Sequence, residues 1–99
     1  MDVAHCPIGQ LDDLRDLLEA IRNWPGVHEP RRGIFYLRRT PFLHFHINRE
    51  GRRWADARVG RSWGTEIEIP FRATAARRSR FLREVQRRYQ ATAKASGLP

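Results

Sequence analysis

The sequence predicts an α+β fold in which four short antiparallel strands lie between two helices, in the order α-β-β-β-β-α. Two observations predict it. Near both ends of the chain, apolar residues recur at steps of three and four, as on one face of a helix, whereas in the middle they alternate with polar residues, as in half-buried strands. The 99 residues fit one domain. We expect a four-stranded meander with both helices on one face of the sheet.

The first helix is expected over residues 9–23. Asp12, Asp13 and Asp16 lie in its early turns, where carboxylates favour the positive end of the helix dipole. Pro25 follows the helix and ends it, because proline cannot continue a helix. Its apolar stripe consists of Leu11, Leu14, Leu17, Leu18 and Ile21.

The middle of the chain is expected to form the four strands, at residues 34–38, 42–47, 54–59 and 65–69. The turn at residues 48–51 joins the second strand to the third, with Gly51 in the left-handed conformation that such a hairpin needs. A hairpin loop at residues 60–64 joins the third strand to the fourth. Pro70 then closes the sheet.

The last helix is expected to begin after Thr74, whose side chain can cap it, and to reach about Ala93. The domain therefore spans residues 9–93, between a flexible N-terminus at 1–8 and a flexible tail at 94–99. The apolar stripe of this helix consists of Phe81, Leu82, Val85 and Tyr89.

Alternation along the strands assigns two faces to the sheet. The core face is expected to carry Leu43, Phe45, Ile47, Ala55, Ala57, Val59, Ile67 and Ile69. The opposite face then carries Phe42, His44, His46, Trp54, Asp56, Arg58, Glu66 and Glu68. A symmetrical turn between the second and third strands places His44 opposite Asp56. A symmetrical loop about Ser62 places Asp56 opposite Glu68, so that the three side chains form one transverse row.

His44, His46 and Asp56 are the candidate site residues of this row. Two histidines and a carboxylate could hold zinc or iron, and a carboxylate that orients a histidine suits acid–base catalysis near neutral pH. The alternative is a solvated face stabilised by pairs of opposite charge. Because neither pattern is specific, we expect no metal and no cofactor.

The same face is expected to expose Phe42 and Trp54, which predicts a contact surface, since large exposed aromatic side chains usually mark one. Arg58 and Glu68 flank them. The surface would take a second copy of the chain, a protein or hydrophobic ligand, or unstacked bases beside Arg58.

The charge of the chain is strongly uneven. Residues 1–30 hold six acidic residues and two arginines, a net charge of −4, whereas residues 31–99 hold five acidic and seventeen basic residues, a net charge of +12. Such a field attracts nucleic acid without sequence preference. Arg80, Arg83 and Arg87 project from the last helix opposite its apolar stripe. They are either a phosphate-contacting face or an ordinary solvated one.

Several classes of protein are not expected from this sequence. Cys6 is the only cysteine, so an internal disulfide is excluded, and its place before the first helix predicts no function for it. The sequence has no signal-peptide pattern and no apolar run of the length that a membrane span needs. We therefore expect a cytoplasmic protein without a membrane partner.

Four short motifs occur in a fixed order: Trp24-Pro25-Gly26-Val27, Gly33-x-Phe35, His44-Phe45-His46 and Ala55-Asp56. With them, residues 11–59 resemble a bacterial luciferase-like domain family, whose members are largely uncharacterised. The resemblance implies a helix ending in Trp-Pro-Gly-Val, then a short strand, a His-containing strand and an Ala-Asp strand. It implies that His44, His46 and Asp56 matter, but it implies neither a reaction nor a flavin.

We therefore expect a non-enzymatic bacterial domain that binds a ligand, a protein or a second copy of itself through its open sheet face. One alternative is non-specific nucleic-acid binding through the arginine-rich surfaces. The other is a metal-dependent enzyme, or a His/Asp acid–base enzyme, that uses His44, His46 and Asp56.

Overall fold

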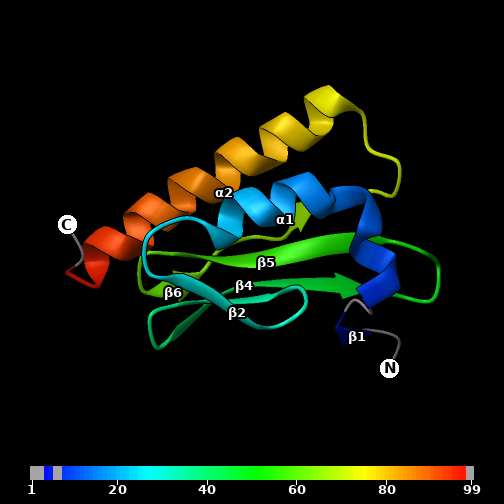
Figure 1. Cartoon of the computed structure of the whole chain (residues 1–99). Coiled ribbons are helices and arrows are strands. Elements are labelled where there is room, and N and C mark those ends of the chain that lie inside the picture. Colours follow the sequence, from blue (N-terminus) through cyan, green and yellow to red (C-terminus); the bar gives the residue numbers. More distant parts are fainter. Residues whose placement is uncertain (1–3, 6–7, 98–99) are drawn as a thin grey trace.

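Two helices cover one face of an antiparallel sheet in the computed structural model, which describes residues 4–5 and 8–97 (Figure 1). The helical elements are a 3-10 helix η1 (Ile8–Leu14), α1 (Arg15–Arg22) and α2 (Ala75–Ala95). The strands are β1 (Ala4–His5), β2 (Val27–Arg31), β3 (Ile34–Leu37), β4 (Thr40–Ile47), β5 (Arg53–Val59), β6 (Ser62–Trp63) and β7 (Ile67–Glu68). The α+β fold is thus confirmed.

The number of strands differs from the four expected. The order across the sheet is β2-β3-β4-β5-β6, with β1 also paired to β4 and β7 also paired to β5. The missed strand β2 contains Pro30, which breaks a strand pattern in the sequence, but β2 lies at the edge of the sheet, where proline is tolerated. Ala4 and His5 pair with β4 and are not the flexible terminus that we expected. Helix α2 reaches Ala95, two residues further than predicted.

The first helix divides into η1 and α1 at Leu14. Leu11, Leu14 and Leu17 are spaced by three, which matches the three residues per turn of a 3-10 helix, and all three are buried. Leu18 and Ile21 continue the stripe at the spacing of an α-helix. The stripe therefore faces the core as predicted, although the helix type changes along it.

The register between β4 and β5 is the predicted one, with His44 opposite Asp56 and His46 opposite Trp54. The register between β3 and β4 shifts by one residue, because Phe35 pairs with Leu43 whereas Tyr36 pairs with Pro41. Such a bulge inserts one extra residue into a strand. Here it gives β4 two adjacent buried side chains at its start, Phe42 and Leu43, and Phe42 packs edge-on against Tyr89 of α2.

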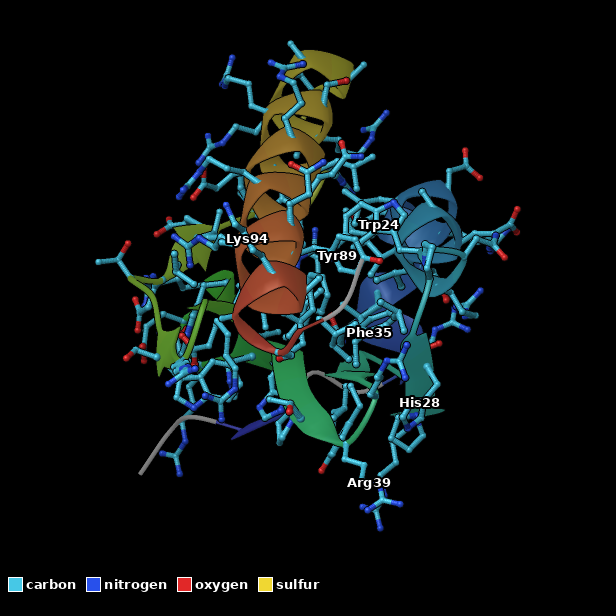
Figure 2. All side chains as sticks on the ribbon, turned by 90° about the vertical axis from the view of Figure 1, so that its left-hand side faces the viewer. Trp24, His28, Phe35, Arg39, Tyr89 and Lys94 are labelled. Carbon is cyan, nitrogen blue, oxygen red and sulfur yellow. The ribbon has the colours of Figure 1, made fainter. Side chains whose placement is uncertain are left out.

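Tyr89 also joins the two helices at this end of the molecule. Its ring lies 5.0 Å from that of Trp24, and its hydroxyl donates a 2.6 Å hydrogen bond to the carbonyl of Pro25 (Figure 2). Burial raises the pKa of the Tyr89 phenol, so the hydroxyl keeps the proton that this bond requires. The tryptophan and proline that end α1 are thereby fixed to α2.

The predicted register at the far side of β5 is wrong. Trp54 pairs with Glu68, and Arg58 pairs with Trp63. The loop after β5 is a tight turn at Gly60 and Arg61, not a symmetrical loop about Ser62, so the returning strand begins earlier. Glu68 consequently lies opposite Trp54 and not opposite Asp56.

Two arginines in the structure are buried and hold its layers together. Arg53 is completely buried and donates to both carboxylate oxygens of Asp13, as well as to three backbone carbonyls. Arg88 lies on the inner side of α2 and donates to Glu84 and to the carbonyls of Ala57 and Thr65. These cations fix the helices to β5 and its neighbours, and they contribute little to the charge of the surface.

In the described part of the chain, neither helix has the length and apolar character that crossing a membrane would require.

Candidate functional site

One face of the sheet remains uncovered by the helices, and we call it the open face (Figure 1). Each of its side chains comes from an outward position of a strand. The residues whose contacts define it are Ile34, Tyr36, His44, His46, Trp54, Asp56, Arg58 and Trp63. The predicted site residues His44, His46, Asp56 and Arg58 all lie here.

Four rings run across the open face in continuous contact, and we call them the ring row. Trp63 lies 5.1 Å from His44, His44 lies 6.1 Å from His46, and His46 lies 5.6 Å from Trp54, measured between ring centroids. The two strands that carry these rings alternate in and out, which puts His44 and His46 on the same side of β4.

Each end of the ring row is covered by an arginine. The guanidinium of Arg58 lies 4.6 Å above the ring of Trp63, and that of Arg52 lies 4.4 Å above Trp54. Such contacts between a cation and an aromatic face are attractive. Arg58 donates to the carbonyls of Pro41 and Arg61 and so is fixed by backbone groups. The arginine on Trp63 is therefore held in place without a carboxylate.

The arginine at the other end is neutralised. Arg52 donates to Glu66 and, at 3.1 Å, to Glu68. These hydrogen bonds, first that of Glu66 and then that of Glu68, raise the pKa of the Arg52 guanidinium. The Trp54 end of the row thus carries no excess positive charge.

His46 and Asp56 form an ion pair across β4 and β5, with 3.0 Å between Nε2 and Oδ2. His44, although directly opposite Asp56 in register, turns its ring toward Trp63. In the part of the chain that the structure describes, no three His, Cys, Asp or Glu side chains are placed to hold a metal ion. His44, His46 and Asp56 are brought together as predicted, but as one ion pair with a neighbouring ring and not as a set of metal ligands.

A hollow of about 330 Å³ opens beside the ring row, between β2, β3 and β4. Its wall consists of Pro30, Arg31, Ile34, Tyr36 and His44. The ring of Tyr36 is supported on its other side by His28, at 5.6 Å between centroids. The hollow therefore combines aliphatic and aromatic side chains with one exposed guanidinium, that of Arg31.

The sheet carries no carboxylate at one of its ends, which we call the basic end. Residues 30–49 and 57–65 contain no Asp or Glu. Arg38 and Arg39 lie in the turn between β3 and β4, Arg61 lies in the turn between β5 and β6, and all three are exposed. Alternate turns of an antiparallel meander lie at the same end. Figure 2 looks onto this end and shows Arg39 extending on the side away from the helices.

Two predicted contact residues are not on the surface. Phe42 is completely buried, because the bulge turns it toward the core, and Trp54 is only 4% exposed beneath Arg52 and His46. Glu68 is exposed but binds Arg52. The exposed aromatic pair that motivated homodimerisation is therefore absent.

The arginines of α2 lie where the sequence predicts them, on the side away from the sheet. Arg80 and Arg83 are exposed. Arg87 is paired with Glu84 through two hydrogen bonds of 3.0 and 2.6 Å. Hydrogen bonds from Arg87 and then Arg88 lower the pKa of Glu84 to about 2, so the pair is charged at neutral pH. The helix face thus offers fewer free cations than its sequence suggests.

Sequence reasoning missed Tyr36, Arg31 and Trp63. Tyr36 could have been found, because Phe35 and Leu37 beside it are apolar core residues and alternation then turns Tyr36 outward. Trp63 was assigned to a loop, although it is the only large apolar residue of the described chain that is substantially exposed, at 43%. The predicted cysteine, Cys6, lies outside the described residues.

The similarity to known proteins was also searched. No family model matches the chain, and neither a curated protein nor a solved structure shows significant similarity to it, so the resemblance to a luciferase-like domain family stays a prediction.

Proposed function

We propose that the protein is a binding module whose open face takes a ligand with a flat ring and a negative charge. The observation that carries the proposal is the hollow at Tyr36, where an exposed arginine stands over an aromatic and aliphatic floor. Ligand sites are typically concave and largely apolar, with a small number of polar groups that orient the ligand. Here Ile34 and Tyr36 would contact the ring, while Arg31 and His44 would meet the charge.

The charge of the surroundings supports an anionic ligand. The nearest carboxylates of the open face are Asp56, which pairs with His46, and the two glutamates that bind Arg52. None of them lies in the wall of the hollow. A positive site with neutralised acids nearby favours anions in both binding and approach.

The test is a titration followed by amide chemical shifts. The probe is 1-naphthyl phosphate, which has a ring and a charge; 1-naphthol has only the ring and inorganic phosphate has only the charge. We expect naphthyl phosphate to shift the amides around Ile34, Tyr36 and His44 at lower concentration than either control. Arg31→Gln should weaken this binding, whereas Arg80→Gln, which removes an exposed arginine from α2, should not. Equal effects of both substitutions, or shifts located elsewhere, would contradict the proposal.

Neither of the other functions is favoured by the geometry. Homodimerisation through the open face loses its motivation, because Phe42 and Trp54 are buried within the chain. A His-based enzyme would need a group poised beside a substrate position, and the nitrogen of His46 that faces Asp56 is engaged by that carboxylate. Ligand binding uses the residues that remain accessible.

A further inference from the structure

We infer that the ligand of the open face is a single strand of nucleic acid, which lies across the sheet from the hollow at Tyr36 to the exposed ring of Trp63. This inference rests on the proposed function and names its ligand class. Three features of the described residues carry it: two separate ring platforms, positive charge along one end of the sheet, and a surface that a duplex could not use.

The first feature is that the open face offers two ring platforms and not one. Tyr36 lies on β3, supported by His28, and Trp63 lies on β6, supported by His44 and Arg58. Three strand spacings separate β3 from β6, a distance of ~14 Å. One flat ligand can stack on one of these rings, whereas consecutive bases of a strand can occupy both.

The rings are also rigidly held, as a stacking platform requires. Trp63 is fixed between a histidine ring and a guanidinium that is itself bound to two backbone carbonyls. It nevertheless stays 43% exposed. Stacking on aromatic side chains tolerates any base sequence, because every base has an aromatic face.

The second feature is the basic end of the sheet. Arg38, Arg39 and Arg61 lie in the two turns that border Tyr36 and Trp63, and the neighbouring chain segments contain no acidic residue. A backbone that joined bases on the two platforms would pass beside these turns. Phosphate contacts of this kind release counterions and give affinity without sequence preference.

The third feature excludes a double helix from this surface. The platforms lie on the broad face of a sheet, and their rings can contact only bases that are not already stacked in a duplex. Single-stranded regions offer such bases. The arginines of α2 lie on the opposite side of the molecule, so they serve as an internal control for charge alone.

The experiment measures the anisotropy of a labelled mixed-sequence oligonucleotide and the fluorescence of the protein's tryptophans. The oligonucleotide is used as a single strand and annealed to its complement. Inorganic polyphosphate and phosphatidylserine vesicles are the comparison polyanions. We expect the single strand to bind more tightly than all three and to quench Trp63. Trp63→Ala should weaken binding by roughly 5- to 150-fold, the range for loss of one stacked base, and Trp63→Phe should retain most of it.

A charge-matched pair of variants locates the phosphates. Arg39→Gln with Arg61→Gln should reduce the slope of log affinity against log salt concentration by about 1. Arg80→Gln with Arg83→Gln removes the same charge from α2 and should leave the slope unchanged. A slope that falls only with the α2 variant would overturn the inference.

The remaining outcomes separate the inference from the function on which it rests. If polyphosphate, vesicles or the duplex bind as tightly as the single strand, and Trp63→Ala has no effect, base stacking is wrong while an anion site stands. If the oligonucleotide binds no more tightly than naphthyl phosphate, the ligand is a small molecule and only the inference fails. If neither probe binds at low salt, both fail.

Discussion

Arg53 and Asp13 form a fork-shaped pair: Nη1 of the arginine donates to Oδ1 at 2.7 Å, and Nη2 donates to Oδ2 at 2.8 Å. The arginine is completely buried, and its remaining donors reach the carbonyls of Gln10, Ile69 and Pro70. These bonds connect η1, β5 and the segment after β7. Paired and fully hydrogen-bonded, the charge is tolerated inside the protein.

Asp13→Asn should therefore be strongly destabilising, because it leaves the buried Arg53 without its counterion. We expect a loss of about 3 kcal/mol in the free energy of unfolding, measured by denaturant titration. Asp12→Asn is the control, since this neighbour is exposed and approaches Arg32 only at 4.0 Å. It should change stability by less than about 0.5 kcal/mol. Similar losses for both variants would show that the buried pair is not what stabilises this region.

The stability should also fall in acid, in a range set by two carboxyl groups. Hydrogen bonds from Arg53 lower the pKa of Asp13, and those from Arg87 and Arg88 lower the pKa of Glu84 to about 2. A carboxyl whose pKa is lower in the folded state stabilises the fold above its unfolded pKa, and this contribution disappears as the pH falls through the folded value. The loss should therefore extend from the ordinary values, 3.8 for Asp13 and 4.5 for Glu84, down to about pH 2.

Glu84→Gln provides the check on this pH dependence. At neutral pH the variant should be less stable than the native protein, because Arg88 is buried and loses its anion. Denaturant titrations at a series of acid pH values should show the two proteins converging as Glu84 becomes protonated. Glu50→Gln, in the exposed turn after β4, should run parallel to the native protein; a parallel curve for Glu84→Gln would contradict the assignment.

The bulge in β4 predicts opposite outcomes for two aromatic residues. Phe42→Ala should cost about 3–5 kcal/mol, because it leaves a cavity against Tyr89 in the core. Trp63→Ala should cost about 1 kcal/mol or less, because its ring is on the surface. Thermal or denaturant unfolding of the two variants measures the difference. If Phe42→Ala were the milder change, Phe42 would lie on the open face and the bulge would be absent.

Gly33 occupies a tight position in the turn between β2 and β3. Its φ is +81°, and a Cβ there would lie 2.6 Å from Cδ1 of Leu11, which is buried. Gly51 has the same conformation, φ +82°, with open space around it. Gly33→Ala should thus destabilise more than Gly51→Ala, for which only backbone strain of ~1–2 kcal/mol is expected. Equal losses in unfolding free energy would mean that Leu11 moves aside freely.

Periodicity was sufficient to predict the layers of this fold and much of its site. The leucine stripe of the first helix, the alternation in β4 and β5 and the pairing of His44 with Asp56 all follow from local patterns. Cap and turn residues were equally informative, since Thr74 caps α2 through a hydrogen bond from the backbone of Arg77. These features depend on residues close together in the sequence.

The features that the sequence did not predict depend on tertiary context. A bulge displaces Phe42 by one position without any change in composition, and nothing local distinguishes it from an outward residue. Arg53 and Arg88 look like surface residues until the partners that satisfy them, Asp13 and Glu84, are brought close by the fold. Trp54 is covered by the side chain of Arg52, a contact that alternation does not describe.

The unequal ends of the sheet have a consequence for how the molecule meets a charged partner. Arg38, Arg39 and Arg61 lie in turns at one end, whereas Glu50 and the glutamates bound to Arg52 lie toward the other. In the field of a polyanion this separation exerts a torque that rotates the protein before contact. The ends are therefore not equivalent in an encounter, and the turn between β3 and β4 leads the approach. Productive collisions become more frequent than random tumbling allows, and added salt should remove that advantage first.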